Sequence, residues 1–238
     1  MSLQTLIENI AAAKPGPKTC AVFDFDWTII SGYSATAFLK DQIARGEIAP
    51  ADLIQLTQAA TRFGIGSLGF SALMAVHAQY LAGRSETDYI ANSERLFRRA
   101  IAKLIYPEAR QLIEAHRAAG HSVAIISSAT PYQVMPAARD LGIQDVYASD
   151  LEVVDGQFTG GVVTPTCFGQ GKVDAAERFT EKQSSDLERC FFYSDSTDDI
   201  QLLEAVGRPV VLNGSRELKA LARESGWAAA DFNSRGPA

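Results

Sequence analysis

Apolar and polar positions divide the chain into three parts with different periodicity. Residues 3–13 have the spacing of a short amphipathic helix, and an uncharged apolar stretch then leads to Asp24. That stretch, with the residues after it, predicts a buried strand over 19–26. Between residues 32 and 106 only helical periodicity occurs, interrupted by glycine and proline. We expect about four helices there, over 33–45, 51–63, 68–82 and 86–105.

From residue 107 onward the pattern alternates between strands and helices. Strands are predicted at 122–126, 145–149, 190–193, 208–212 and 227–232. Helices are predicted at 108–119, 130–141, 172–182, 198–206 and 217–224. A hairpin is predicted over 152–158, with Asp155 and Gly156 at its turn.

This alternation predicts a parallel sheet with helices on both faces. The fold class is therefore α/β, with a Rossmann-like core, an inserted all-helical domain and a small β-hairpin. The helical segment separates the first strand from the others, so the core is discontinuous in sequence. We expect residues 1–31 and 107–238 to form the core and residues 32–106 to form the insertion.

Composition and charge exclude several classes of protein. The 238 residues are 47% hydrophobic and 21% charged, which is ordinary for a globular protein. The net charge of -6 argues against nucleic-acid binding, because no basic excess is present to meet phosphates. No apolar run reaches the length of a membrane span, and residues 3–13 contain Glu8 without a basic flank. We therefore expect a cytoplasmic protein with no stable membrane insertion.

Reactive side chains follow several of the predicted strands. Ligands of an open parallel sheet bind at the carboxyl ends of its strands, so these residues are expected to meet there. They are Asp24 and Asp26 after the first strand, Ser127 and Ser128 after the second, Lys172 at a helix start, and Asp195, Asp198 and Asp199 after the strand at 190–193. Singly, each has an ordinary explanation as a turn, capping or solvated residue; their conjunction favours a functional site.

These residue types suit phosphoryl transfer. An aspartate is a nucleophile that is ionised at neutral pH, and Mg²⁺ removes its repulsion from a phosphate dianion. Lysine supplies a second positive charge, and a serine hydroxyl donates a hydrogen bond. A second aspartate can protonate the leaving alkoxide and later deprotonate the attacking water.

Four motifs resemble those of the haloacid dehalogenase superfamily, in its phosphoserine-phosphatase-like branch, subfamily IB. Asp24 to Thr28 resembles the motif D-x-D-x-T, Ile126-Ser127 the second motif, Lys172 the third, and Ser194 to Asp199 the fourth. The resemblance implies a helical cap domain of the C1 type at 32–106.

The resemblance also implies roles for individual residues. Asp24 would be the nucleophile and Asp26 the acid and base, with Ser127 and Lys172 completing the catalytic set. Mg²⁺ would be held by Asp24, the Asp26 backbone carbonyl and Asp195. Asp199 would support the metal site through these ligands without binding the ion directly. The residues expected to bind phosphate are Ser127, Ser128, Lys172, Phe25 and Asp26.

The chain departs from that branch at three positions. Ser194 replaces a glycine, and Asp198 stands where phosphoserine phosphatases carry asparagine. Tyr33 occupies the position of a glutamate that pairs with the ammonium group of phosphoserine. We take Tyr33, Arg62 and Asp198 as candidates for substrate selection. We expect phosphoserine to be a poor substrate and alcohol, sugar or lipid-headgroup phosphates to be better ones.

The sequence favours a Mg²⁺-dependent phosphatase that hydrolyses a small phosphorylated metabolite, a phosphomonoester, through an aspartyl phosphate. A phosphomutase or phosphotransferase that uses the same aspartyl phosphate is the first alternative. A signalling receiver domain is the second, because receivers also use aspartate, serine or threonine, lysine and Mg²⁺. Receivers are much shorter, however, and lack both a helical insertion and a second acid two residues after the phosphoacceptor.

Overall fold

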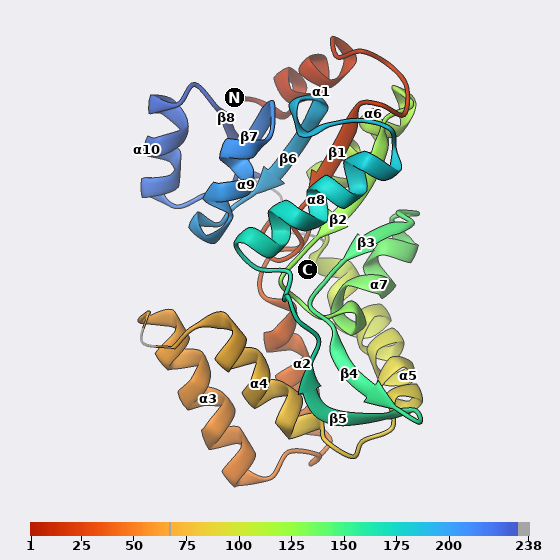
Figure 1. Ribbon diagram of the computed structural model, residues 1–238, viewed down its shortest axis with the longest axis vertical. Coiled ribbons are helices and arrows are strands. Elements are labelled where there is room, and N and C mark those ends of the chain that lie inside the picture. The colour runs from red at the N-terminus through yellow and green to blue at the C-terminus, as the bar shows by residue number, and fades with distance from the viewer. Residues whose placement is uncertain (67, 233–238) are drawn as a thin grey trace.

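The computed structural model describes residues 1–66 and 68–232, and a six-stranded sheet forms its upper half in Figure 1. The strand order is β3-β2-β1-β6-β7-β8, and each neighbouring pair is parallel. The strands are β1 (Cys20–Phe23), β2 (Ser122–Ile126), β3 (Asp145–Tyr147), β6 (Cys190–Ser194), β7 (Arg208–Leu212) and β8 (Ala228–Ala230). The predicted α/β fold with a parallel sheet is confirmed.

Helices cover both faces of this sheet because alternate strand residues point to opposite sides. Ala21 and Phe23 belong to the apolar core on one face, and Cys20 and Val22 to the core on the other. The first core includes residues of α1 (Leu3–Ala11), α6 (Pro107–Ala118) and α7 (Pro131–Asp140). The second includes residues of α8 (Gln170–Lys182), α9 (Ile200–Ala205) and α10 (Arg216–Glu224). The uncharged segment 20–23 is fully buried for this reason.

The insertion between β1 and α6 contains helices at the predicted places. They are α2 (Ser34–Ala44), α3 (Pro50–Gly64), α4 (Phe70–Leu81) and α5 (Glu86–Leu96). The single helix predicted over 86–105 is wrong in its last third, which is a π-helix (Phe97–Ile101) and then a 3-10 turn (Ala102–Leu104). Phe97 and Ile101 are buried at a spacing of four, which the wider π turn keeps on one side, and Ile105 is buried directly after the 3-10 turn.

A two-stranded antiparallel hairpin lies beside the insertion. It comprises β4 (Leu151–Val154) and β5 (Gln157–Val162), and its turn is at Asp155 and Gly156, with φ of 51° and 75°. The Asp-Gly turn is as predicted. Phe158 exchanges backbone hydrogen bonds with the end of α4, at Gly83 and Arg84. The hairpin, which the sequence-based division placed with the core, therefore packs against the helices of the insertion (Figure 1).

Two further boundaries differ from those predicted. β1 ends at Phe23, three residues before the predicted end, because the chain turns sharply after Asp24. The helix predicted over 198–206 is divided into a 3-10 turn, Thr197–Asp199, and α9. The carboxylates that follow β1 and β6 consequently lie on turns beyond the sheet edge.

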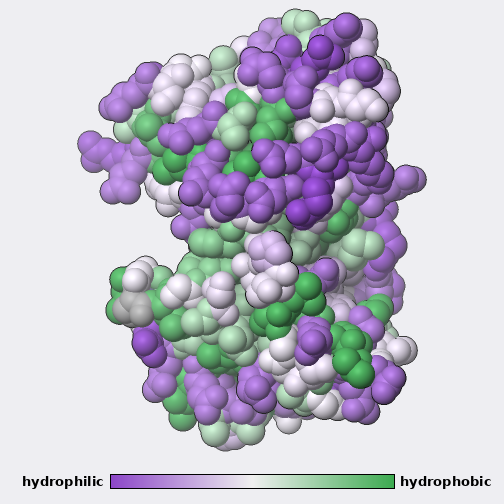
Figure 2. Space-filling model, in the orientation of Figure 1, coloured by the Kyte–Doolittle hydropathy of each residue, from purple (hydrophilic) through white to green (hydrophobic). Residues whose placement is uncertain are grey.

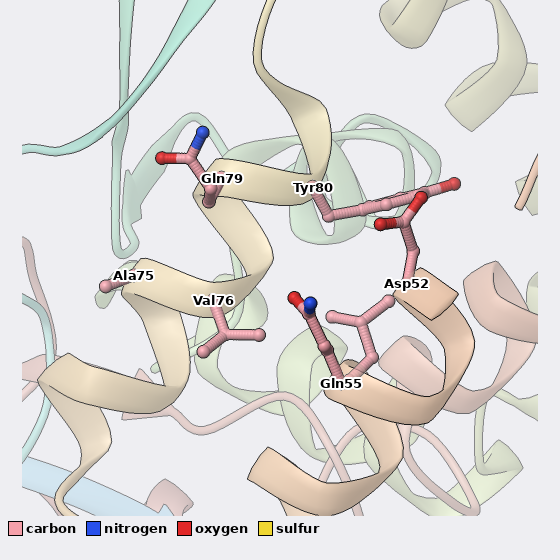
Figure 3. A pocket seen from close by; sticks show the side chains of 7 residues that line it. Asp52, Gln55, Ala75, Val76, Gln79 and Tyr80 are labelled. Atoms are coloured by element: carbon pink, nitrogen blue, oxygen red, sulfur yellow. The ribbon is translucent and has the colours of Figure 1, made fainter. Parts of the chain in front are cut away.

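A hollow of about 290 Å³ opens inside the insertion, between α3 and α4 (Figure 3). Asp52 and Gln55 line it from α3, and Val76, Gln79 and Tyr80 line it from α4. The Arg84 guanidinium lies 4.3 Å from the centre of the Tyr80 ring, at the end of α4. None of the residues singled out by the sequence lines this hollow.

Two features of the fold bear on the composition: the state of the three cysteines and the hydrophobicity of the helices. Cys20, Cys167 and Cys190 are buried free thiols. In residues 1–66 and 68–232, no helix combines the length and apolar character that a membrane crossing requires.

A buried polar chain lies on one face of the sheet and ends at Tyr193, the residue before Ser194 in β6. His116 is hydrogen-bonded through Nδ1 to His121 Nδ1 at 2.9 Å and through Nε2 to the Tyr193 hydroxyl at 2.8 Å. His116 is fully buried, and its ring meets Phe23 and Phe191 edge to face. Burial, with His121 and Arg208 nearby, lowers the pKa of His116 to about 3.

This depressed pKa predicts a contribution of His116 to acid sensitivity. Between pH 6.5 and 3, His116 is protonated in the unfolded chain and neutral in the folded chain. The free energy of unfolding therefore falls as the pH decreases through this range. The loss between pH 7.5 and 5.5 is about 1.4 kcal/mol. Urea unfolding of wild type and His116→Gln at both pH values measures it, because all other titrating groups are shared. An equal pH dependence in the two proteins would contradict the assignment.

Candidate active site

A buried ion-pair cluster lies at the carboxyl ends of β1 and β6. The Lys172 ammonium, in the first turn of α8, donates to Asp24 Oδ1 at 3.0 Å and to Asp199 Oδ2 at 2.8 Å. All three side chains are less than one-tenth exposed. Burial raises the pKa of Asp24, and Lys172 opposes that rise. The two carboxylates in turn raise the pKa of Lys172 against the effect of burial, so the lysine stays charged.

The residues after β6 hold this cluster in place. Ser194 Oγ donates to Asp199 Oδ2 at 2.7 Å and accepts from Ser196 N at 3.0 Å. The serine that stands at the usual glycine position therefore uses its hydroxyl to fix Asp199 and the turn. Asp195 follows directly, and the Thr28 hydroxyl donates to Asp195 Oδ1 at 3.3 Å. The D-x-D-x-T segment is thus tied to the turn after β6.

Asp26 is oriented away from Lys172 by a second set of hydrogen bonds. Ser34 donates to its two carboxylate oxygens, from N at 2.8 Å and from Oγ at 3.2 Å. Gln133 Nε2 donates to Ser34 Oγ at 3.0 Å, and Gln133 Oε1 accepts from Thr130 N at 2.8 Å. Burial raises the pKa of Asp26 to about 7, and the Asp24 charge adds to the rise while Ser34 opposes it. Asp24 and Asp26 therefore sit in different environments despite their spacing.

The predicted phosphate-binding residues lie in the segments that follow β1 and β2 and in the first turn of α8. Ser127 follows β2, the neighbour of β1, and is buried; its backbone N–H donates to Tyr147 O. Its Oγ accepts from Ala129 N at 3.2 Å, so the hydroxyl proton remains available to a ligand. Ser128 is partly exposed in the same turn. Phe25 is buried between Asp24 and Asp26 and can contribute only its backbone to a ligand.

The donor set fits a magnesium ion. Burial raises the pKa of Asp195 to about 8, and the charges of Asp24 and Asp199 add to the rise. Three carboxylates, those of Asp24, Asp195 and Asp199, thus lie near the single ammonium of Lys172. Among the described residues, no cluster of three His, Cys, Asp or Glu side chains forms a ready metal cage. Mg²⁺ needs no such cage, since it binds one or two carboxylates and keeps several waters. Asp24 and Asp195 meet that requirement, while the Asp199 carboxylate is engaged by Lys172 and Ser194.

An aromatic rim borders the carboxylates. Trp27 and Tyr33 are 39% and 61% exposed, and their rings meet edge to face at 5.9 Å. Burial raises the pKa of the Tyr33 phenol, and the charges of Asp195, Asp26, Asp198 and Asp24 add to the rise. Tyr33 therefore lies within electrostatic reach of the catalytic carboxylates, and Asp198 is exposed beside them. Arg62 lies exposed near the end of α3.

The site lies where the core faces the insertion, and the two parts also touch through aromatic residues. Phe168, just before α8, stacks on Phe70 at the start of α4 with ring centres 4.4 Å apart, and Phe63 meets both. Figure 2 shows an indentation between the two halves, at the left of the view, with mainly apolar residues on its lower wall. A ligand can enter between the insertion and the sheet edge.

Sequence reasoning missed several residues that orient the site. Ser34, Gln133 and Thr28 position Asp26 and Asp195 through hydrogen bonds. Gln133 appeared in the sequence only as a residue in the first turn of the helix predicted at 130–141, and Thr28 only as the last residue of the D-x-D-x-T motif. Ser34 left no signal, because its role depends on how the insertion starts. Trp27 also left none, since the motif tolerates any residue at that position.

Comparison with known proteins finds relatives that are named as phosphatases. It is 35% identical over 217 residues to phosphoserine phosphatase SerB1 of Mycobacterium tuberculosis, covering 89% of this chain and 70% of that protein. It is 28% identical over 220 residues to a histidinol-phosphatase of Neisseria meningitidis, covering 90% and 99%.

Solved structures and family models agree with these relatives. A Bordetella pertussis protein of unknown function superposes with a TM-score of 0.84 at 28% identity, covering 91% of this chain and 99% of that one. The model of the haloacid dehalogenase-like hydrolases matches residues 21–204, from β1 to α9. This range contains all four motifs and most of the chain, and the chain therefore belongs to the haloacid dehalogenase-like hydrolase family.

Proposed function

We propose that the chain is a Mg²⁺-dependent phosphatase that hydrolyses a small phosphomonoester through a phosphate ester of Asp24. The observation that carries this proposal is the separation of the two motif aspartates: Asp24 is paired with Lys172, and Asp26 is turned toward Ser34. Lys172 favours the ionised form of Asp24, and burial keeps Asp26 protonatable by raising its pKa to about 7. The phosphatase relatives support the same reaction class.

In the first half of the reaction, an Asp24 carboxylate oxygen attacks phosphorus and the bond from phosphorus to the leaving oxygen breaks. The Lys172 ammonium offsets negative charge around the phosphoryl group, 3.0 Å from Asp24. Ser127 Oγ–H and backbone N–H groups after β1 donate to phosphate oxygens. The electron pair of the broken bond stays on the leaving oxygen, and the proton of Asp26 passes to it.

In the second half, Asp26 is a carboxylate and accepts a proton from water. The water oxygen attacks phosphorus, and the bond between phosphorus and Asp24 breaks. Inorganic phosphate leaves, and both aspartates return to their starting states. The pKa of Asp26, raised to about 7 mainly by burial, suits a group that must give and take a proton near neutral pH.

Mg²⁺ bound to Asp24, Asp195 and the Asp26 carbonyl would supply the positive charge that allows an anionic substrate to approach an anionic nucleophile. The presence of three carboxylates, those of Asp24, Asp195 and Asp199, near one lysine supports this assignment. Asp199 acts indirectly: it accepts a hydrogen bond from Lys172 and thereby holds that ammonium toward Asp24.

Removal of the nucleophile tests the proposal directly. Asp24→Asn should lower phosphate release from p-nitrophenyl phosphate by on the order of 10³ or more. The fold should persist, because Lys172 keeps its contact with Asp199 at 2.8 Å. Steady-state release with Mg²⁺, and circular dichroism of both proteins, provide the measurement. Substantial turnover by a correctly folded Asp24→Asn rules out the mechanism.

Asp26 should matter most where the leaving group needs a proton. Asp26→Asn should slow the first step with an alkyl phosphate by about 10²–10⁴ and with p-nitrophenyl phosphate much less. The amide preserves the acceptor for Ser34 N. Rapid-quench measurement of the first turnover with each substrate separates the effects. Equal losses for both substrates would show that Asp26 is not the acid.

Metal and phosphate contacts should separate by mutation. Asp195→Ala should weaken Mg²⁺ binding by calorimetry at least 10-fold, since it removes one of the two carboxylate ligands. Ser127→Ala should leave Mg²⁺ affinity nearly unchanged and weaken inhibition by inorganic phosphate. Unchanged Mg²⁺ affinity in Asp195→Ala would place the metal elsewhere.

A further inference from the structure

We propose that Trp27, Tyr33 and Asp198 form the subsite for the leaving group, and that this subsite selects phosphomonoesters whose alcohol carries a cationic amine headgroup without a carboxylate. The proposal rests on the phosphatase function proposed above. It concerns the part of the substrate that lies beyond the phosphate, on the solvent side of Asp26.

Trp27 is held in an unusual conformation at this position. Its φ is 58°, in the left-handed region that bulky side chains rarely adopt. Backbone hydrogen bonds fix it there: its N–H donates to Gly32 O at 3.2 Å, and its carbonyl accepts from Asn213 Nδ2 at 2.9 Å. Asn213 is itself anchored, since its Oδ1 accepts from Phe232 N at 2.8 Å. Strain maintained by three separate segments points to a function for the residue that bears it.

The indole is presented where a leaving group has to pass. Trp27 directly follows Asp26, the residue that protonates the leaving oxygen, and 39% of its surface is exposed. Tyr33 lies just before α2, whose first residue Ser34 orients Asp26. The two rings are 5.9 Å apart at an angle of 82°, so they form the corner of an aromatic cage. A substituent that extends from the phosphate past Asp26 meets both rings.

The charge around this corner is negative. The carboxylates of Asp195, Asp26 and Asp198 all act on the Tyr33 phenol. Asp195 and Asp26 are engaged with Thr28 and Ser34, whereas Asp198 has an exposed side chain. Aromatic faces attract cations, and an adjacent carboxylate strengthens that attraction. A cationic headgroup is therefore stabilised here.

The same charge disfavours a substrate carboxylate. Phosphoserine would bring its carboxylate beside the exposed carboxylate of Asp198, and Lys172 already contacts Asp24 and Asp199. An amino alcohol phosphate brings the cation without that penalty. A purely apolar leaving group would pack on Trp27 and Tyr33 without using Asp198, and the experiment distinguishes this case.

The test compares phosphocholine with 3,3-dimethylbutyl phosphate, which has the same shape but no charge. Wild type should prefer phosphocholine in kcat/KM by roughly 10-fold, the size expected of a cation bound by aromatic rings. Trp27→Leu and Asp198→Asn should each move the ratio toward one. Phosphoserine should fall below phosphocholine in wild type.

Trp227→Leu provides the matched control, because it makes the same substitution at the chain's other tryptophan. Trp227 precedes β8 and lines a separate groove between the N-terminus and β7. The substrate ratio should therefore stay at its wild-type value in this variant. An equal fall in Trp227→Leu would overturn the assignment to Trp27.

The outcomes separate this inference from the proposed function. A ratio near one or below in wild type overturns the cationic subsite if p-nitrophenyl phosphate is still hydrolysed in an Asp24-dependent manner. A ratio that survives both Trp27→Leu and Asp198→Asn also overturns it. If no phosphomonoester is hydrolysed in an Asp24-dependent manner, the proposed function itself is wrong, and the inference falls with it.

Discussion

Carboxylates buried at the edge of a parallel sheet are costly unless positive charge accompanies them, and here one lysine provides it. Lys172 lies 3.0 Å from Asp24 and 2.8 Å from Asp199, and all three side chains are buried. Asp195 adds another carboxylate to the same edge, where burial and the charges of Asp24 and Asp199 raise its pKa. The edge is thus built to receive more positive charge, and an ion such as Mg²⁺ has the oxygen ligands it requires.

The insertion gives the two motif aspartates different chemistry. Asp26 is held by Ser34, the first residue of α2, and Ser34 is held by Gln133 of the core helix α7. The contact between insertion and core therefore orients the acid directly. Tyr33 precedes Ser34 and brings an exposed ring to the carboxylates, against Trp27. In the function proposed above, one turn at the start of the insertion serves both proton transfer and the selection of the leaving group.

The sequence predicted those features that local patterns determine. The buried strands, the insertion and the Asp-Gly hairpin turn all follow from periodicity and turn chemistry, as do the strand-end positions of Asp24, Ser127 and Asp195. Contacts between distant segments were not predictable. The sequence could not show that Ser194 secures Asp199, that Ser34 orients Asp26, or that the hairpin joins the insertion. Each depends on where the tertiary fold places residues with no local signal.

The central claim is that phosphate passes through Asp24. Turnover of a phosphomonoester quenched with acid, followed by borohydride reduction and peptide mapping, locates an acyl phosphate by converting its aspartate to homoserine. The account predicts homoserine at position 24, in the wild-type protein only when substrate and Mg²⁺ are both present. Reduction at another aspartate, or an unmodified Asp24 in protein quenched during rapid turnover, would contradict it.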